Sequence, residues 1–95
     1  MRIDVLLHIS DTMVTVEEQV GYITGNVKRK QIVDVLDKKG SESAEMLGKI
    51  TRAPKLVLDH ALEDMVKKEI VKKSKDKYEL TDQGKQAVNV MRSIH

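Results

Sequence analysis

The sequence contains no cysteine, phenylalanine or tryptophan, and it has a single proline. The absence of cysteine excludes disulfide bonds, thiolate metal sites and cysteine nucleophiles. Because Tyr22 and Tyr78 are the only aromatic residues, the core has to be built from aliphatic side chains and methionine, which suits helix-on-helix packing. No apolar run approaches the roughly 20 residues that span a bilayer, and no export signal is visible. We therefore expect a helix-rich, cytosolic protein that has no contact with a membrane.

Residues suited to catalysis or to metal binding are few and scattered. The three histidines lie far apart in the sequence, so we expect no metal site and no cofactor. Serine, histidine and aspartate occur, but none lies in a glycine-supported nucleophile turn, and the five glycines form no phosphate-binding loop. The sequence predicts that the protein is not an enzyme.

Positive charge is concentrated in one part of the chain. The formal net charge is +2, but residues 1–26 carry one basic residue against four acidic ones. Residues 27–95 hold 16 basic and 11 acidic residues, and six lysines fall between residues 67 and 77. A lysine run is often only a solvated surface. It is also the local basic charge expected of a protein that contacts nucleic-acid phosphates.

The first 24 residues give mixed signals. Residues 3–9 alternate as a half-buried strand would, yet Leu6 also allows residues 2–10 to form a helix, and both interpretations stay open. Thr15 followed by Glu18 has the spacing of a capping box and predicts a short helix from about residue 16. Gly21 and Gly25 then predict a loop.

Two helices are predicted between residues 26 and 53. Asn26 is a good N-cap for a helix over residues 27–39, whose apolar stripe falls on Ile32, Val35 and Leu36, and Gly40 is placed to end it with a left-handed residue. Residues 41 and 43 are serines that can cap a helix over residues 44–49, with Ala44, Leu47 and, less clearly, Met46 turned inward. Residues 50–53 are the predicted turn.

The only proline marks the start of a third helix. Pro54 has no N–H to lose at the first position of a helix, and Leu58, Ala61, Leu62 and Met65 then repeat at helical spacing on the inward side. A hairpin follows over residues 70–80, with turn residues at 74–76. Thr81 caps a last helix, whose apolar side is predicted to comprise Ala87, Val88, Met91 and Ile94.

This order of elements is the outline of a winged helix-turn-helix domain, in which a basic hairpin, the wing, lies beside a helix that enters the major groove of DNA. We expect a mainly α fold with a small β-hairpin (α+β), residues 1–24 being an N-terminal extension and residues 25–95 the winged domain. The predicted base-contacting residues of the third helix are Lys55, Leu56, Asp59 and His60. The predicted phosphate-contacting residues are Arg52, Lys67, Lys72, Lys73, Lys75 and Lys77.

The segment from Ala44 to Leu62 resembles the helix-turn-helix of small prokaryotic regulators of the ArsR and MarR type. The resemblance continues to residues 78–84, Tyr-Glu-Leu-Thr-Asp-Gln-Gly, which are similar to the Tyr-x-Leu-Thr-x-x-Gly that ends the wing in this superfamily. Upstream, residues 25–32 are similar to the opening of the first helix in ArsR-like proteins. About 70 residues are covered, and the resemblance implies a sequence-specific DNA-binding transcriptional regulator.

Several residues depart from that pattern. Glu69 stands where relatives usually have a glycine in a left-handed conformation, which leaves open how the chain turns into the wing. Leu56 and Val57 replace the common serine and threonine, and Asp59 and Glu63 place acids on the groove-facing side. These departures favour an alternative in which the winged helix contacts another protein and does not bind DNA.

Apolar residues at both ends of the chain predict a homodimer. A single small module covers only a few base pairs, whereas two modules related by a twofold axis read two half-sites about 10 base pairs apart. The alternative is that the two ends pack on each other within one chain. The predicted interface residues are Ile3, Val5, Leu7, Ile9, Val88, Met91 and Ile94.

Overall fold

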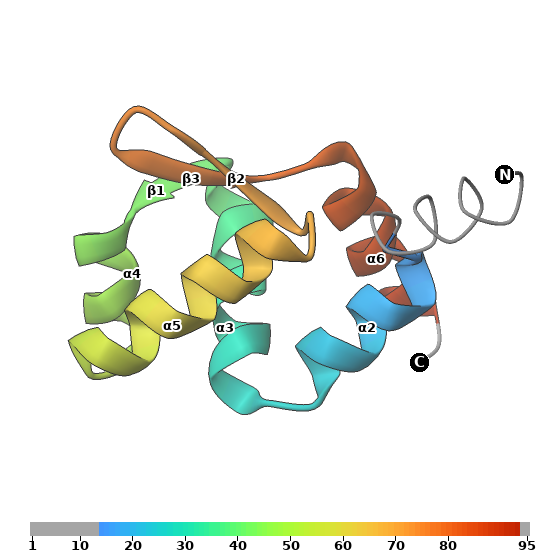
Figure 1. Cartoon of the computed structure of the whole chain (residues 1–95), viewed down its shortest axis with the longest axis horizontal. Coiled ribbons are helices and arrows are strands. Elements are labelled where there is room, and N and C mark those ends of the chain that lie inside the picture. The colour runs from blue at the N-terminus through green and yellow to red at the C-terminus, as the bar shows by residue number, and fades with distance from the viewer. Residues whose placement is uncertain (1–13, 94–95) are drawn as a thin grey trace, which may run out of the picture.

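The computed structural model describes residues 14–93, which form five helices and one small antiparallel sheet (Figure 1). The mainly α fold with a β-hairpin wing is therefore confirmed. Within the described residues, no helix is long and apolar enough to cross a membrane. In chain order, the elements are α2 (Val16–Thr24), α3 (Val27–Lys39), β1 (Ser41–Ser43), α4 (Ala44–Thr51), α5 (Lys55–Lys67), β2 (Val71–Ser74), β3 (Lys77–Leu80) and α6 (Asp82–Ser93).

Helix α2 begins at the predicted capping box. The Thr15 hydroxyl accepts from the Glu18 N–H at 3.1 Å, and the Glu18 carboxylate accepts from the Thr15 N–H at 3.2 Å. The loop predicted between Gly21 and Gly25 is wrong, because the helix continues through Gly21 to Thr24. Ile23 lies fully buried in the common core, so this helix packs as part of the same body as the rest of the fold.

Helix α3 has the predicted bounds and the predicted cap. The Asn26 side chain accepts from the N–H groups of Lys28 at 2.8 Å and of Arg29 at 3.2 Å. Its buried residues are Ile32, Val33 and Leu36, so the apolar stripe is turned slightly from the one predicted, and Val35 is only partly buried. Gly40 has the positive φ expected of the residue that ends the helix, 90°, although its ψ of −56° lies outside the left-handed helical region.

The helix-turn-helix is formed by α4, a short turn and α5. Ser43 caps α4 by accepting from the Met46 N–H at 3.2 Å, but α4 extends to Thr51, two residues beyond its predicted end. The side chain of Met46 is exposed, so the suggestion that it faces inward is wrong. Pro54 is the residue before α5, not its first residue.

A strand that the sequence did not predict completes the sheet. Strand β1 pairs antiparallel with β3, with Ser41 opposite Glu79 and Ser43 opposite Lys77, and the sheet order is β1-β3-β2. Strand β3 is therefore the central strand, paired on its other edge with β2 in the predicted hairpin. The sequence predicts only helix caps at residues 41 and 43, and this prediction is confirmed for Ser43 but is wrong for Ser41.

Helices α2 and α6, which are the first and last helices of the described chain, pack together at one end of the molecule (Figure 1). Val88 and Met91 of α6 lie in the chain's own core, with 2% and 6% of their surface exposed. This corrects the prediction that they are spare apolar surface for a dimer, since packing within the chain already covers them. Ile3, Val5, Leu7, Ile9 and Ile94 lie outside the described residues.

The start of α6 is fixed against the start of the wing by Thr81 and Gly84. The Thr81 hydroxyl accepts from the Gly84 N–H at 2.9 Å, which confirms Thr81 as the cap, and it also reaches the backbone carbonyls of Glu69 and Ile70. A Cβ atom at Gly84 would clash with the Ile70 carbonyl oxygen. The Leu-Thr-x-x-Gly sequence thus has a structural reason, because only glycine allows this approach.

We predict that Gly84→Ala destabilises the fold by about 2 to 3 kcal/mol, because the added methyl forces backbone apart in a packed region. Gly21→Ala is the matched control. Its added methyl meets nothing within 4 Å, so it should stabilise α2 by about 0.5 to 1 kcal/mol. Urea unfolding followed by circular dichroism measures both. A Gly84→Ala variant as stable as the parent would contradict the close packing described.

Candidate nucleic-acid interface

Helix α5 lies between the wing on one side and the junction of α2 with α3 on the other (Figure 1). Its inward residues Leu58, Leu62 and Met65 are buried, as the spacing predicted. The four residues predicted to contact bases are all exposed: Lys55, Leu56, Asp59 and His60. The outer surface of α5 is therefore available along its length.

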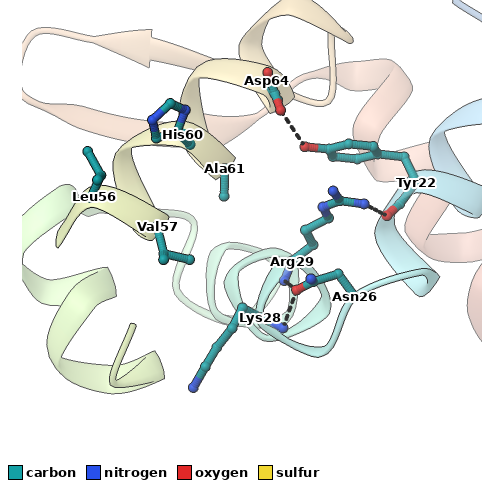
Figure 2. A pocket seen from close by; sticks show the side chains of 9 residues that line it. All are labelled: Tyr22, Asn26, Lys28, Arg29, Leu56, Val57, His60, Ala61 and Asp64. Carbon is teal, nitrogen blue, oxygen red and sulfur yellow. Dashed lines mark hydrogen bonds between the residues drawn. The ribbon is translucent and has the colours of Figure 1, made fainter. Parts of the chain in front are cut away.

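The four predicted base-contacting residues do not share one surface. Lys55 and Asp59 line a cleft of about 390 Å³ between α4 and α5. Leu56 and His60 line a separate cleft of about 310 Å³ on the other flank, which faces the α2–α3 junction (Figure 2). Any partner of α5 therefore meets a lysine and an aspartate on one flank, and a leucine and a histidine on the other.

The wing lysines are divided in the same way. Because successive side chains of a strand point to opposite faces, Lys73 shares the face of buried Val71, whereas Lys72 points the other way. The Lys73 ammonium lies 5.7 Å from the ring centre of its cross-strand partner Tyr78. On the opposite face, Lys72 stands opposite Glu79.

One surface thus joins the inner face of the wing to α5. Lys73 and Tyr78 line a hollow together with Lys67, Asp59 and Glu63 of α5. Lys75 lies at the exposed tip of the hairpin, while Lys77 shares the outer face of the wing with Lys72 and Glu79. The structure therefore brings Lys67 and Lys73 together in a hollow that neither Lys72 nor Lys77 lines.

The turn from α5 into the wing keeps the geometry that a glycine would give. Glu69 has a φ of 61°, and its N–H donates to the Val66 carbonyl at 3.1 Å. The N–H of Ile70 donates to the Met65 carbonyl at 2.9 Å, and both of these apolar side chains are buried. These two hydrogen bonds form a Schellman motif. Glutamate at this left-handed position therefore leaves the turn intact, at a cost in backbone strain.

A cluster around Tyr22 joins α2, α3 and α5 (Figure 2). The Arg29 guanidinium lies 3.8 Å from the centre of the Tyr22 ring and donates to the Tyr22 carbonyl at 3.0 Å. The Lys68 ammonium also lies over the ring, at 5.0 Å. The Tyr22 hydroxyl donates to Asp64 at 3.4 Å. Burial raises the pKa of Tyr22 above 10.0; the positive charge of Arg29 opposes this rise and Asp64 adds to it.

Lys28 and Arg29 are interface candidates that are not among the residues predicted from the sequence to contact DNA. Both line the cleft that contains Leu56 and His60, and the Lys28 ammonium donates to the Thr51 carbonyl at the end of α4. Their signal was the basic run at residues 28–30, directly after the N-cap. This run of three basic residues is a weaker signal than the six lysines between residues 67 and 77.

Comparison with protein families matches residues 17–94 to the family described as "Methanogenesis regulatory protein FilR1, N-terminal domain". The chain belongs to this family. The FilR1 N-terminal family is one of regulatory-protein domains, and the match begins inside α2, so it includes all but the first residue of a helix that lies in the predicted N-terminal extension. Comparisons with curated proteins and with solved structures gave no match.

The left-handed residue before the wing gives a test of backbone strain. We predict that Glu69→Gly stabilises the domain by about 0.5 to 1 kcal/mol, because a left-handed conformation costs a residue with a Cβ about 1 kcal/mol or more. Glu69→Ala, which removes the same side chain but keeps the Cβ, should give no such gain. Urea unfolding measures both variants. Equal stabilisation by glycine and alanine would place the effect in the glutamate side chain and not in the backbone.

Proposed function

We propose that this domain binds double-stranded DNA as a transcriptional regulator, with α5 in the major groove and the wing beside the phosphates. The observation that carries the proposal is the placement of an exposed helix next to a lysine-bearing hairpin, in a chain that belongs to a family of regulatory-protein domains. A winged helix-turn-helix of the ArsR and MarR superfamily is the architecture that we assign to it. We expect it to act in the cytoplasm, without a cofactor.

The two parts of this surface have different charges, which assigns them different roles. Helix α5 carries two lysines against three carboxylates, whereas the hairpin carries four lysines against two carboxylates. Phosphate contacts supply most of the affinity for DNA and depend on cations, so they fall to the wing. Base contacts supply discrimination and do not require net positive charge, so they fall to α5.

A winged helix that contacts a protein is the second candidate. Leu56 is 70% exposed and Val57 is 48% exposed on the same flank of α5, and an apolar pair of this kind can dock on another chain. Selecting bound duplexes from a random pool discriminates the two functions. Recovery of a preferred sequence supports DNA binding, whereas the absence of any bound duplex at low salt would leave protein contact as the function.

The wing gives a test of the phosphate contacts. We predict that replacing Lys73 and Lys75 by alanine lowers the slope of log affinity against log salt by about 2 units, since each phosphate contact contributes about 0.9. Replacing Lys72 and Lys77, which lie on the outer face, should change the slope less. Binding to a duplex of unrelated sequence, measured at several salt concentrations, gives these slopes. If both double variants have the same salt slope as the parent, the wing does not contact the phosphates.

A separate test concerns sequence reading by α5. We predict that Lys55→Ala and His60→Ala each weaken binding to the selected duplex by about 1 to 3 kcal/mol, as expected for a lost base contact. Binding to an unrelated duplex should hardly change, because nonspecific binding depends on phosphates. Losses of equal size on both duplexes would show that these two residues do not read sequence.

We further propose that the regulator acts as a homodimer. Two copies related by a twofold axis would address two half-sites about 10 base pairs apart, which a single module cannot do. Val88 and Met91 are buried within the chain, so we assign the contact to Ile3, Val5, Leu7, Ile9 and Ile94 together with Val90, which is 38% exposed on α6. Sedimentation equilibrium at micromolar concentration distinguishes a dimer from a single chain.

A further inference from the structure

We propose that Lys28, Arg29 and Arg52, named here the corner patch, contact DNA phosphates on the flank of α5 opposite the wing. The inference rests on the proposed DNA-binding function. A helix with its side chains is about 10 to 12 Å wide and fills a major groove of about 12 Å, so one phosphate backbone runs along each of its flanks. The wing provides cations for one backbone. The corner patch provides them for the other.

Two observations place the patch on that flank. Lys28 and Arg29 line the cleft that α5 borders with Leu56, Val57 and His60 (Figure 2). Arg52 is exposed and directly follows Thr51, whose carbonyl accepts a hydrogen bond from the Lys28 ammonium, so its backbone lies beside Lys28 at the turn before α5. Lys67 and Lys73 line a different hollow with the wing. The helix therefore has cations on both of its sides.

The charge of the patch is not neutralised by carboxylates. Among residues 14–93, the only ion pair joins Arg92 to Asp37, at 2.5 Å, on other elements. The one carboxylate that lines the cleft belongs to Asp64, which accepts from the Tyr22 hydroxyl. The N–H groups of Lys28 and Arg29 are already bonded by Asn26, so the patch depends on side-chain charge and not on the helix end.

The structure also holds two of these cations in place. The Arg29 guanidinium is stacked on the Tyr22 ring, and only one of its nitrogens bonds to a carbonyl. Lys28 donates once to Thr51, although an ammonium has three hydrogens. Because both groups are held beside the cleft with donors to spare, they lose little side-chain freedom when a phosphate binds.

The test uses the double variant Lys28→Gln with Arg52→Gly, together with a matched control. Glycine suits position 52, because Arg52 has a φ of 58°, so the charge is removed without strain. The control is Lys30→Gln. Lys30 is an exposed residue of α3 that lies two positions, or about 200° around the helix, from Lys28 and does not line the cleft.

We expect the double variant to lower the salt slope by about 2 units on a selected duplex and on an unrelated one, while the control keeps the slope of the parent. Lys28→Arg, which keeps the charge, should also keep the slope. If Lys28 only supports the end of α4, Lys28→Gln will lower the stability in urea and leave the slope unchanged, which would overturn the proposal. A slope lowered equally by Lys30→Gln would also overturn it.

Ethylation interference gives a readout specific to each strand. Ethylation of a contacted phosphate weakens binding of the parent but not of a variant that has lost that contact. The phosphates identified in this way for the double variant should lie across the major groove from those identified for the Lys73→Ala, Lys75→Ala variant. If both variants lose contact with the same phosphates, the corner patch and the wing do not lie on separate flanks of α5.

If the parent shows no salt-dependent binding to any duplex, the DNA-binding function fails as well. If the Lys28→Gln, Arg52→Gly variant binds like the parent while the Lys73→Ala, Lys75→Ala variant binds more weakly, only the proposed role of the corner patch is overturned.

Discussion

The backbone carbonyl of Ile70 is the point at which α5, the wing and α6 are held together. It accepts from the Thr81 N–H at 3.0 Å, it lies 3.2 Å from the Thr81 hydroxyl, and it is so close to Gly84 that no side chain fits there. The Thr81 hydroxyl lies 2.5 Å from the Glu69 carbonyl as well, and its single hydrogen is shared between the two acceptors. The direction in which the wing leaves α5 is thus fixed at one junction. The distance between the wing lysines and α5 depends on it.

Sequence patterns that span only one or two turns of helix correctly predicted where most of the helices of this fold begin. The helix caps predicted from the sequence are present in the structure at Thr15, Asn26, Ser43 and Thr81. They could be predicted because the side-chain oxygen of a cap and the N–H groups that it bonds lie within three residues of each other. Strand β1 could not be found in this way. Its three residues show no alternation of apolar and polar side chains, and its pairing partners in β3 follow more than 30 residues later. Its existence is a property of the assembled sheet.

The candidate interface shows the same limit. Helical spacing correctly separated the buried from the exposed residues of α5, because that spacing is internal to one helix. The two-residue period of a strand places Lys72 and Lys73 on opposite faces of the predicted hairpin, but it does not reveal that the face of Lys73 is the one that lies toward α5. Nor does spacing reveal that Lys28 meets the end of α4, a contact between residues 23 positions apart. Grouping residues from different elements requires the packing of those elements.

The acids on α5 bear on how such an interface would discriminate. In the proposed complex, Asp59 and Glu63 stand beside Lys67 and Lys73 in the hollow below the wing, so each carboxylate lowers the attraction of this region for any phosphate. A carboxylate in the major groove gains a hydrogen bond only where it meets a donor such as the amino group of cytosine. Beside any other base, the carboxylate loses its bound water and gains no hydrogen bond in exchange. In the proposed complex, a nearly neutral α5 between two basic flanks would therefore separate the two tasks: the flanks would attract every duplex, and the helix would penalise most of them.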